Sequence, residues 1–151
     1  EEKNMTPEQF QHRIRQNAEQ VKQAINRTIP VKVGRAAKDH FQENFDKGGF
    51  VNGGLHPWKR SKRIGRAKGA AGGYKTLMVD GSSFFFFEYH PGTAKVDVVN
   101  NVPYARVHNE GLRAGRGRGF QMPRRQFIGE SKELTKKVED IIENEIGRIL
   151  Q

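Results

Sequence analysis

The 151-residue chain contains no cysteine, which excludes disulfide bonds and thiolate chemistry. It is also poor in apolar residues, which make up 34% of the sequence, and its mean hydropathy is -0.81. No apolar run approaches the ~20 residues that a helix needs to cross a bilayer, so no membrane partner is expected. The length suits a single domain with a real core. The 17 glycines indicate that part of the chain lies outside that core.

Positive charge is abundant and concentrated in two segments. Residues 56–75 hold seven Lys or Arg, residues 112–126 hold five, and neither segment contains an acid. Outside these two segments the chain holds 15 Lys or Arg and 17 Asp or Glu, so the remaining chain is near neutral. Basic loops of this kind usually meet phosphate or an acidic protein surface, with solubility as the simpler alternative. The candidate DNA or acidic-partner contacts are Lys59, Arg60, Lys62, Arg63, Arg66, Arg113, Arg116 and Arg118.

Two helices are expected in the N-terminal part. Thr6-Pro7-Glu8-Gln9 combines a capping threonine, a first-turn proline and a capping-box glutamine. Apolar residues then recur at helical spacing as far as Ile25. This first helix is expected to end before Pro30, because the residue that precedes a proline avoids helical backbone angles. A second helix is expected over Val31–Phe45, stopped by the Lys-Gly-Gly that follows.

The segment from Phe50 to Tyr74 has no reliable periodicity. Trp58 is expected to anchor this segment to the rest of the fold, because an indole ring packs against apolar residues while its N–H needs a polar partner. Mobility is expected from Lys59 to Gly73, since a loop this long is usually functional or disordered.

The most β-prone stretch is Phe84–Tyr89, which begins with Phe84, Phe85, Phe86 and Phe87. Four consecutive phenylalanines cannot alternate between a buried and an exposed face, so both faces of such a strand need cover. The second face is covered either by this chain or by a second subunit, which makes these four residues a candidate subunit interface. His90–Thr93 is expected to turn the chain into a second strand over Ala94–Val98, giving a β-hairpin.

The C-terminal third begins with Tyr104–Asn109, where one or two helical turns capped by a left-handed Gly111 are favoured and a strand is the alternative. Gly115–Gly119 is interpreted as a flexible hairpin tip rather than a phosphate loop or an RGG-type RNA-binding segment. Phe120–Met122 is expected to add a short strand beyond it.

Ser131 is expected to cap the final helix. Lysines early in this helix and acids later oppose the helix dipole, so packing must outweigh that term. Its apolar stripe consists of Leu134, Val138, Ile141, Ile142, Ile146 and Ile149.

These elements predict an α+β fold in one domain spanning residues 1–151. A small antiparallel sheet is expected to carry an N-terminal helical pair and a long C-terminal helix, with two long basic loops. The expected parts are a helical part (6–46), a long basic loop (47–76), a β-rich part with the Gly/Arg loop (77–128) and the C-terminal helix (130–150).

No catalytic site is expected. The histidines at positions 12, 40, 56, 90 and 108 are scattered, and without cysteine they give no support to a metal site. Ser82 and Ser83 have no nearby base and no nucleophile-elbow pattern. Tyr104 and His108 are interpreted as residues that hold their own turn. The sequence thus predicts no catalytic, cofactor-binding or metal-binding residue, no cofactor, and no enzymatic activity.

Two short segments carry a family resemblance. The first is Pro103-Tyr104-Ala105-Arg106-Val107-His108-Asn109-Glu110-Gly111. After the Gly/Arg loop comes the second, Pro123-Arg124-Arg125-Gln126-Phe127-Ile128-Gly129. Their order and spacing resemble the phage virion morphogenesis (tail-completion) family of Mu-like phages and prophages, over roughly residues 50–150. The motif residues are Tyr104, Ala105, His108, Asn109, Gly111, Pro123, Arg124, Phe127 and Gly129.

The resemblance implies a non-enzymatic virion protein, assembled in the bacterial host cytoplasm and placed at the head–tail junction. It implies that the protein completes the tail and joins it to the head. The implied partners are further copies of the chain in a ring, other tail and head-connector proteins, and the packaged DNA that passes through. The residues alone leave an alternative open, a basic nucleic-acid-binding protein unrelated to virions, which would bind free DNA tightly and with a steep salt dependence.

Overall fold

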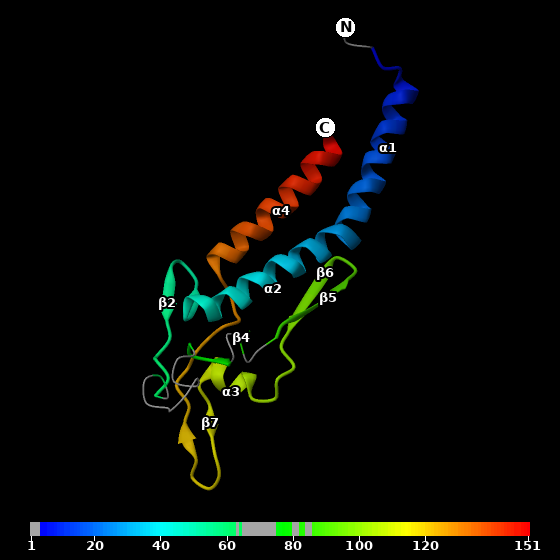
Figure 1. Ribbon diagram of the computed structural model, residues 1–151. Coiled ribbons are helices and arrows are strands. Elements are labelled where there is room, and N and C mark those ends of the chain that lie inside the picture. The colour runs from blue at the N-terminus through cyan, green and yellow to red at the C-terminus, as the bar shows by residue number, and fades with distance from the viewer. Residues whose placement is uncertain (1–3, 63, 65–74, 80–81, 84–85) are drawn as a thin grey trace.

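The computed structural model describes residues 4–62, 64, 75–79, 82–83 and 86–151. Its main feature is a long helical rod with a second helix beside it (Figure 1). The rod consists of α1 (Pro7–Gln23), a π-helical segment η1 (Ala24–Thr28) and α2 (Ile29–Lys47). The second helix is α4 (Lys132–Leu150), and a short helix α3 (Ala105–Glu110) lies among the loops beyond the end of α2.

The strands form small antiparallel pairs. They are β1 (Gly49–Val51) with β2 (Leu55–Pro57), β3 (Met78–Val79) with β4 (Ser82–Ser83), β5 (Glu88–Gly92) with β6 (Lys95–Val99), and β7 (Arg113–Ala114) with β8 (Phe120–Gln121). The predicted α+β class, with N-terminal helices, small antiparallel strands and a C-terminal helix, is confirmed. Within the described residues, however, the strands form four separate pairs and not one sheet.

The predicted helix end before Pro30 is wrong, because the rod passes through this proline without a break. In a regular α-helix a proline ring clashes with the carbonyl of residue i−4 and removes a hydrogen bond. Here η1 precedes the proline, and the Ile29 N–H reaches back five residues to the Ala24 carbonyl. A π turn of this kind changes the register of the ladder just where the proline enters. The predicted N-terminal helical pair is therefore one continuous helix.

The predicted stop after the second helix is confirmed, since Gly48 closes α2 in the left-handed conformation at φ 69°. The segment after it contains a hairpin, β1–β2, which the sequence reading assigned to irregular loop. Most of the basic segment after this hairpin consists of residues 63 and 65–74, which lie outside the described residues. The prediction of mobility from Lys59 to Gly73 therefore falls mainly outside the described residues as well.

The predicted hairpin exists as β5–β6, but two details of the prediction are wrong. Phe86 and Phe87 precede β5 instead of belonging to it, and Phe84 and Phe85 lie outside the described residues. The residues expected to turn the chain, His90 to Gly92, continue β5, and the turn is made by Thr93 and Ala94.

The position of the turn explains why a strand can contain Pro91. Gly92 and Lys95 flank a two-residue turn and so form a hydrogen-bonded pair. Pro91, paired with Val96, is then at a position where no N–H is needed for the ladder.

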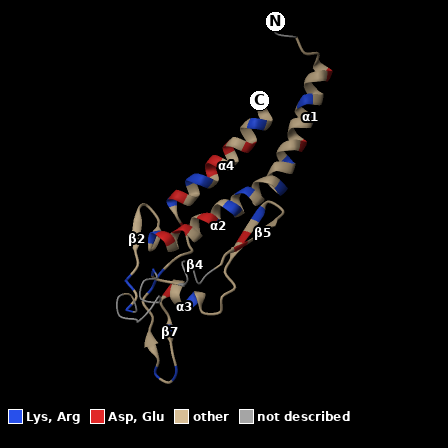
Figure 2. Ribbon diagram, in the orientation of Figure 1, with Lys and Arg blue, Asp and Glu red and all other residues tan. Residues whose placement is uncertain are grey.

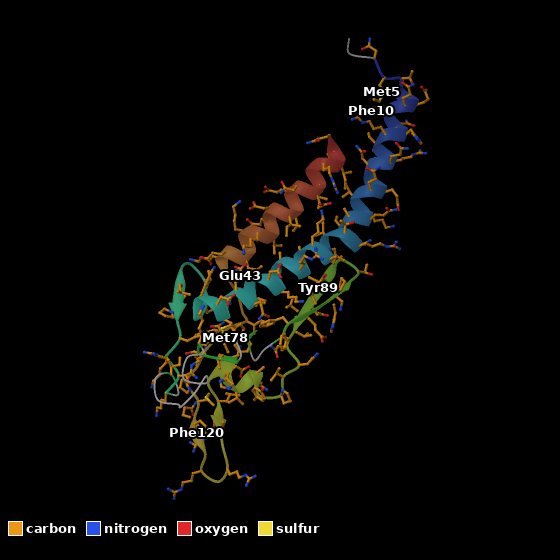
Figure 3. All side chains as sticks on the ribbon, in the orientation of Figure 1. Met5, Phe10, Glu43, Met78, Tyr89 and Phe120 are labelled. Carbon is orange, nitrogen blue, oxygen red and sulfur yellow. The ribbon has the colours of Figure 1, made fainter. Side chains whose placement is uncertain are left out.

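A helical glycine lets this hairpin lie against α2. A Cβ atom on Gly34 would stand 2.6 Å from Tyr89 Cδ2 and 2.7 Å from Val96 Cγ2, closer than real Cβ contacts. Figure 3 shows Tyr89 beside α2. Gly34 thus weakens the helix locally but permits close packing of the hairpin.

Aromatic rings form the core at the C-terminal end of α2. Phe45 and Phe127 are 1% and 0% exposed, and their ring centroids lie 5.3 Å apart. Phe87 packs against Phe127 at 5.9 Å and against Phe41 at 6.0 Å. The rest of the core cluster consists of Ala37, Phe50, Leu77, Met78 and Ala105. Nine of the eleven buried apolar residues in the described ranges belong to this cluster.

Helix α4 packs along the rod, and the helix dipole favours the placement of two of its charged residues. Glu133 lies in its first turn and Arg148 in its last turn, each in the position that the helix dipole favours. The buried Glu145 forms salt bridges with Lys32 of α2 and with Arg148, the latter at 2.7 Å. The hydrogen bond from Lys32 is the main reason why the pKa of Glu145 lies below its ordinary value.

None of the helices in the described ranges has the length and apolar character needed to cross a membrane.

Replacing the fully buried Phe127 should unfold the chain more easily. We expect Phe127→Ala to lower the free energy of unfolding by about 3–5 kcal/mol, because it removes a ring from the centre of the core and leaves a cavity. Phe120→Ala is the matched control, since Phe120 is 55% exposed on the β7–β8 hairpin. Urea unfolding of both variants measures the difference, and equal midpoints would contradict the assigned core.

Candidate functional site

The two motif segments identified in the sequence are brought together by direct hydrogen bonds. The predicted helical turns are α3, closed by Gly111 at φ 70° as expected. The Oδ1 atom of Asn109 accepts from the N–H groups of Phe127 at 2.9 Å and Ile128 at 3.1 Å. The carbonyl of His108 accepts from the Arg125 N–H at 2.8 Å. The first motif therefore holds the second in place.

The second motif is also bonded from its other sides. We call Arg125–Ile128 the central segment. Asn44, fully buried in α2, donates from Nδ2 to the Phe127 carbonyl at 3.0 Å. Trp58 donates from Nε1 to the Gln126 carbonyl at 2.7 Å, and its ring packs on Phe45 with centroids 5.4 Å apart. Trp58 thus attaches the start of the basic loop to the body, as predicted from the sequence.

Gly111 is required by both conformation and space. Its φ of 70° is strained for other residues, and a Cβ atom there would lie 2.9 Å from the backbone nitrogen of Arg124. The motif glycine therefore lies where the end of α3 comes close to the backbone of the second motif.

Arg125, counted among the basic residues of the second loop, is not a surface charge. It is 7% exposed, and its Nε donates to the Lys59 carbonyl at 2.9 Å. Burial lowers the pKa of its guanidinium below the ordinary value. Arg125 joins the two basic segments at their base and leaves the other arginines to face outward.

Tyr104 and His108 contact each other, with ring centroids 6.2 Å apart in an edge-on arrangement. Burial, followed by the nearby charge of Arg125, lowers the pKa of His108 below its ordinary value. An imidazole that favours its neutral form and packs beside a tyrosine is suited to holding a turn. This geometry agrees with the structural role expected for the pair.

A second network, not expected from the sequence, ties the β1–β2 hairpin to α4. Glu133 accepts hydrogen bonds from the N–H groups of Gly53 and Gly54, each at 2.9 Å. The N–H of Gly54, the N–H of Glu133 itself and that of Gly53 lower the pKa of Glu133 to about 2. Ser131 caps α4 as predicted, and its Oγ lies 3.0 Å from Nε2 of the buried His40. Burial and then Lys137 lower the pKa of His40.

The basic residues lie at the periphery of this framework. The Gly/Arg run forms the tip of the β7–β8 hairpin, as predicted, and Figure 2 shows its basic residues projecting from one end of the molecule. Arg116 and Arg118 are exposed at the tip, while Arg113 donates to the Arg118 carbonyl and braces it. Lys59, Arg60 and Lys62 are exposed near the Trp58 anchor, and Arg63 and Arg66 lie outside the described residues.

The predicted phenylalanine interface divides between core and surface. Phe87 is 2% exposed and belongs to the core of this chain, whereas Phe86 is 68% exposed. Phe84 and Phe85 lie outside the described residues. Phe87 is thus covered within the chain, and a subunit contact through Phe86 stays a prediction.

Across the described residues, no group of three or more His, Asp and Glu side chains lies close enough to hold a metal ion. An open groove of about 530 Å³ lies between the β1–β2 hairpin and the second motif. Its walls include Trp58, Arg124 and Glu130, a mixed lining that suits a polar protein surface better than a small apolar ligand.

The sequence reading missed Asn44, His40 and Glu133. Asn44 had a usable signal, because it lies three residues after Phe41 and one before Phe45 on the apolar side of a helix. A polar residue with low helix propensity in that position usually bonds to buried backbone. Glu133 had no comparable signal, since its partners are 79 and 80 residues away in the sequence.

A comparison with known protein families gives one match. The model of the phage virion morphogenesis family matches residues 8–147, which covers α1 from its second residue and extends well before residue 50, where the resemblance in the motifs begins. No curated protein and no solved structure matches the chain significantly.

Asn109 should contribute measurably to stability. Asn109→Ala removes the acceptor of two partly buried N–H groups, and we expect a loss of about 1–3 kcal/mol in the free energy of unfolding. Asn144→Ala, on an exposed position of α4, is the control and should change little. Urea unfolding of both variants tests this. If Asn109→Ala had the same free energy of unfolding as the control variant, the two motifs would hold together without this side chain.

Glu133 should make stability pH-dependent. Its pKa in the folded chain lies below the ordinary 4.5, so the carboxylate stabilises the fold above pH 4.5. This contribution is lost as the pH falls toward 2. Glu133→Gln should therefore lower the Tm at neutral pH, and the gap between variant and wild type should close under acid. A gap that persists at the acid end would contradict the charge-dependent role.

Proposed function

The chain belongs to the phage virion morphogenesis family and so has a structural or assembly role in phage particles, and we propose that within this role it completes the tail and joins it to the head. It acts without catalysis at the head–tail junction, as a ring of copies around the DNA path. Its other partners are tail and head-connector proteins.

The observation that carries this proposal is the projecting basic hairpin. Arg116 and Arg118 stand at the far end of β7–β8, on a framework fixed by α3 and the central segment (Figures 1 and 2). A rigid base with a positively charged tip can reach DNA phosphates or an acidic neighbouring protein without disturbing the core.

The small strand pairs support assembly with further chains. A two-stranded pair has two outer edges, and the outer edge of a sheet can accept a strand from a neighbouring chain. A head-to-tail arrangement of identical copies closes into a ring when the rotation between neighbours allows it.

The competing function, nucleic-acid binding unrelated to virions, differs in its affinity for free DNA. It requires tight binding to free DNA. The logarithm of the association constant should then fall linearly with the logarithm of the salt concentration. An assembly protein, by contrast, needs DNA contacts only within the assembled particle. Fluorescence anisotropy of duplex DNA with the purified chain, at low and physiological salt, separates the two functions.

Deletion of the gene from a phage or prophage that encodes the chain tests the proposal. We expect filled heads and unattached tails to accumulate, as seen by electron microscopy, and joined particles to return when the wild-type chain is supplied from a plasmid. Normal joined particles without the chain would refute a role in tail completion, and absence of tails altogether would place the chain earlier in assembly.

The hairpin tip should be needed for joining and not for folding. Arg116→Ala/Arg118→Ala should fail to restore phage titre in the deletion strain while keeping the wild-type Tm, because both side chains are exposed. Arg113 is left unchanged since it braces the hairpin. The charge-matched control Arg27→Ala/Arg35→Ala, on the helical rod, should restore titre. Equal titres from both double variants would remove the hairpin from the proposal.

A further inference from the structure

Helix α1 has an apolar face that the chain itself does not cover. None of its 17 residues is buried, and Phe10 and Ile14 are 57% and 51% exposed. Its N-terminal turns extend past the C-terminal end of α4, where Phe10 is far from the core (Figures 1 and 3). An isolated helix of this length is marginal in water and is normally stabilised by packing of its amphipathic face. The stripe runs at helical spacing through Phe10, Ile14, Ala18, Val21 and Ile25.

The last residue of the stripe, Ile25, also lines an open apolar groove on the same chain. This groove, of about 320 Å³, lies between the helical rod, the β5–β6 hairpin and α4. Ile25 and Ile142 on its rim are 43% and 42% exposed. From Ile142 the apolar surface continues along α4 at four-residue spacing to Ile146 and Leu150, the latter 57% exposed. The groove itself is lined by Ile25, Ile29, Pro30, Val33, Ala94, Val96, Val138 and Ile142, with Lys95 as its one charged lining residue.

The two apolar surfaces carry opposite charges along their sides. On a helical wheel, Arg15 and Lys22 flank the α1 stripe on the side turned away from Arg13, which donates to the C-terminal Gln151 carbonyl at 3.3 Å. On α4, Glu139 and Glu143 flank the line through Ile142 and Ile146 in the same way. In the described part of the chain, these four side chains form no hydrogen bond or salt bridge, although Glu139 and Glu143 are close enough to Lys136 to contribute to its raised pKa. Two basic side chains therefore flank the apolar face of α1, and two acidic side chains flank the apolar face of α4 beside the groove. Opposite charges placed in this way are complementary.

We propose that α1 of one copy of this chain docks on the α4 groove of the next copy. Phe10 and Ile14 pack against Ile142 and its neighbours, and the basic flank of α1 faces the acidic flank of α4. Because the two surfaces are different, the contact is head-to-tail, so every copy offers one helix and one groove. This inference rests on the proposed ring and names the surfaces that would build it.

The absence of cysteine makes a direct test possible, since any introduced thiol is unique. Ile14→Cys and Ile142→Cys are made singly, at exposed positions, with a small size tag on one of them. Both are supplied together to a phage that lacks its own copy, and the assembled tails are purified and mildly oxidised. We expect a disulfide-linked pair containing one tagged and one untagged chain, and none when either variant is supplied alone.

The other outcomes overturn the inference in distinguishable ways. Ile14→Cys linked to a second Ile14→Cys would show a symmetric dimer, and a link to a different virion protein would show that α1 docks elsewhere. Intact tails that contain the chain but give no link would reject this interface while leaving the ring proposal standing. Tails that lack the chain would reject both. Phe120→Cys in place of Ile14→Cys is the matched control and should give no link to Ile142→Cys.

Charge reversal provides an independent readout. Glu139→Lys/Glu143→Lys should lower the mass of the assembled species in light scattering, and adding Arg15→Glu/Lys22→Glu should restore it. Asp39→Lys/Asp46→Lys, an equal charge change on exposed positions of α2, is the control and should leave the mass unchanged. Loss of assembly that the second pair of substitutions does not restore would contradict the pairing of these two flanks.

Discussion

The central segment Arg125–Ile128 places Phe127 in the core and belongs to no helix or strand among the described residues. Its backbone groups must still be hydrogen-bonded, because an unpaired buried N–H or carbonyl costs about 1–3 kcal/mol. Side chains supply what a neighbouring strand would supply elsewhere. Asn44 and Trp58 donate to its carbonyls, and Asn109 accepts from its N–H groups. The position of Phe127 between the aromatic rings depends on these bonds.

This one segment organises the molecule around it. Asn44 belongs to the long helical rod, and Trp58 begins the first basic loop. Asn109 lies in the last turn of α3, the short helix before the second basic loop. Because Arg125 is buried between the two basic segments, their bases are joined while their remaining charges point outward. The helical rod and α4 extend away from this centre in the other direction. The chain thus has a basic end and a helical end, which suits a protein that must contact different neighbours on opposite sides.

Sequence patterns predicted the features that depend on local chemistry. Ser131 as a cap, Gly111 as a left-handed helix end and the Gly/Arg run as a hairpin tip all follow from short-range rules, and each was confirmed. The effect of Pro30 was misjudged because a π-helical turn replaces the ordinary α-helical hydrogen bonds before it. No residue pattern in the sequence indicated this turn. Phe86 and Phe87 were misjudged because apolar character alone does not show where a strand begins. Both residues precede β5, and only Phe87 is buried in the core. The partners of Asn44 and Glu133 lie some 80 residues away, and only the fold brings them together.

The central claim is that this chain completes the phage tail as a ring whose basic hairpins face the DNA path. Electron cryo-microscopy of tails purified before head attachment tests it most directly. The account predicts density for several copies in a closed ring at the head-proximal end, with Arg116 and Arg118 toward the axial channel and α1 of each copy on α4 of the next. Tails whose head-proximal end lacks this chain, or a ring with the hairpins on its outer rim, would contradict it.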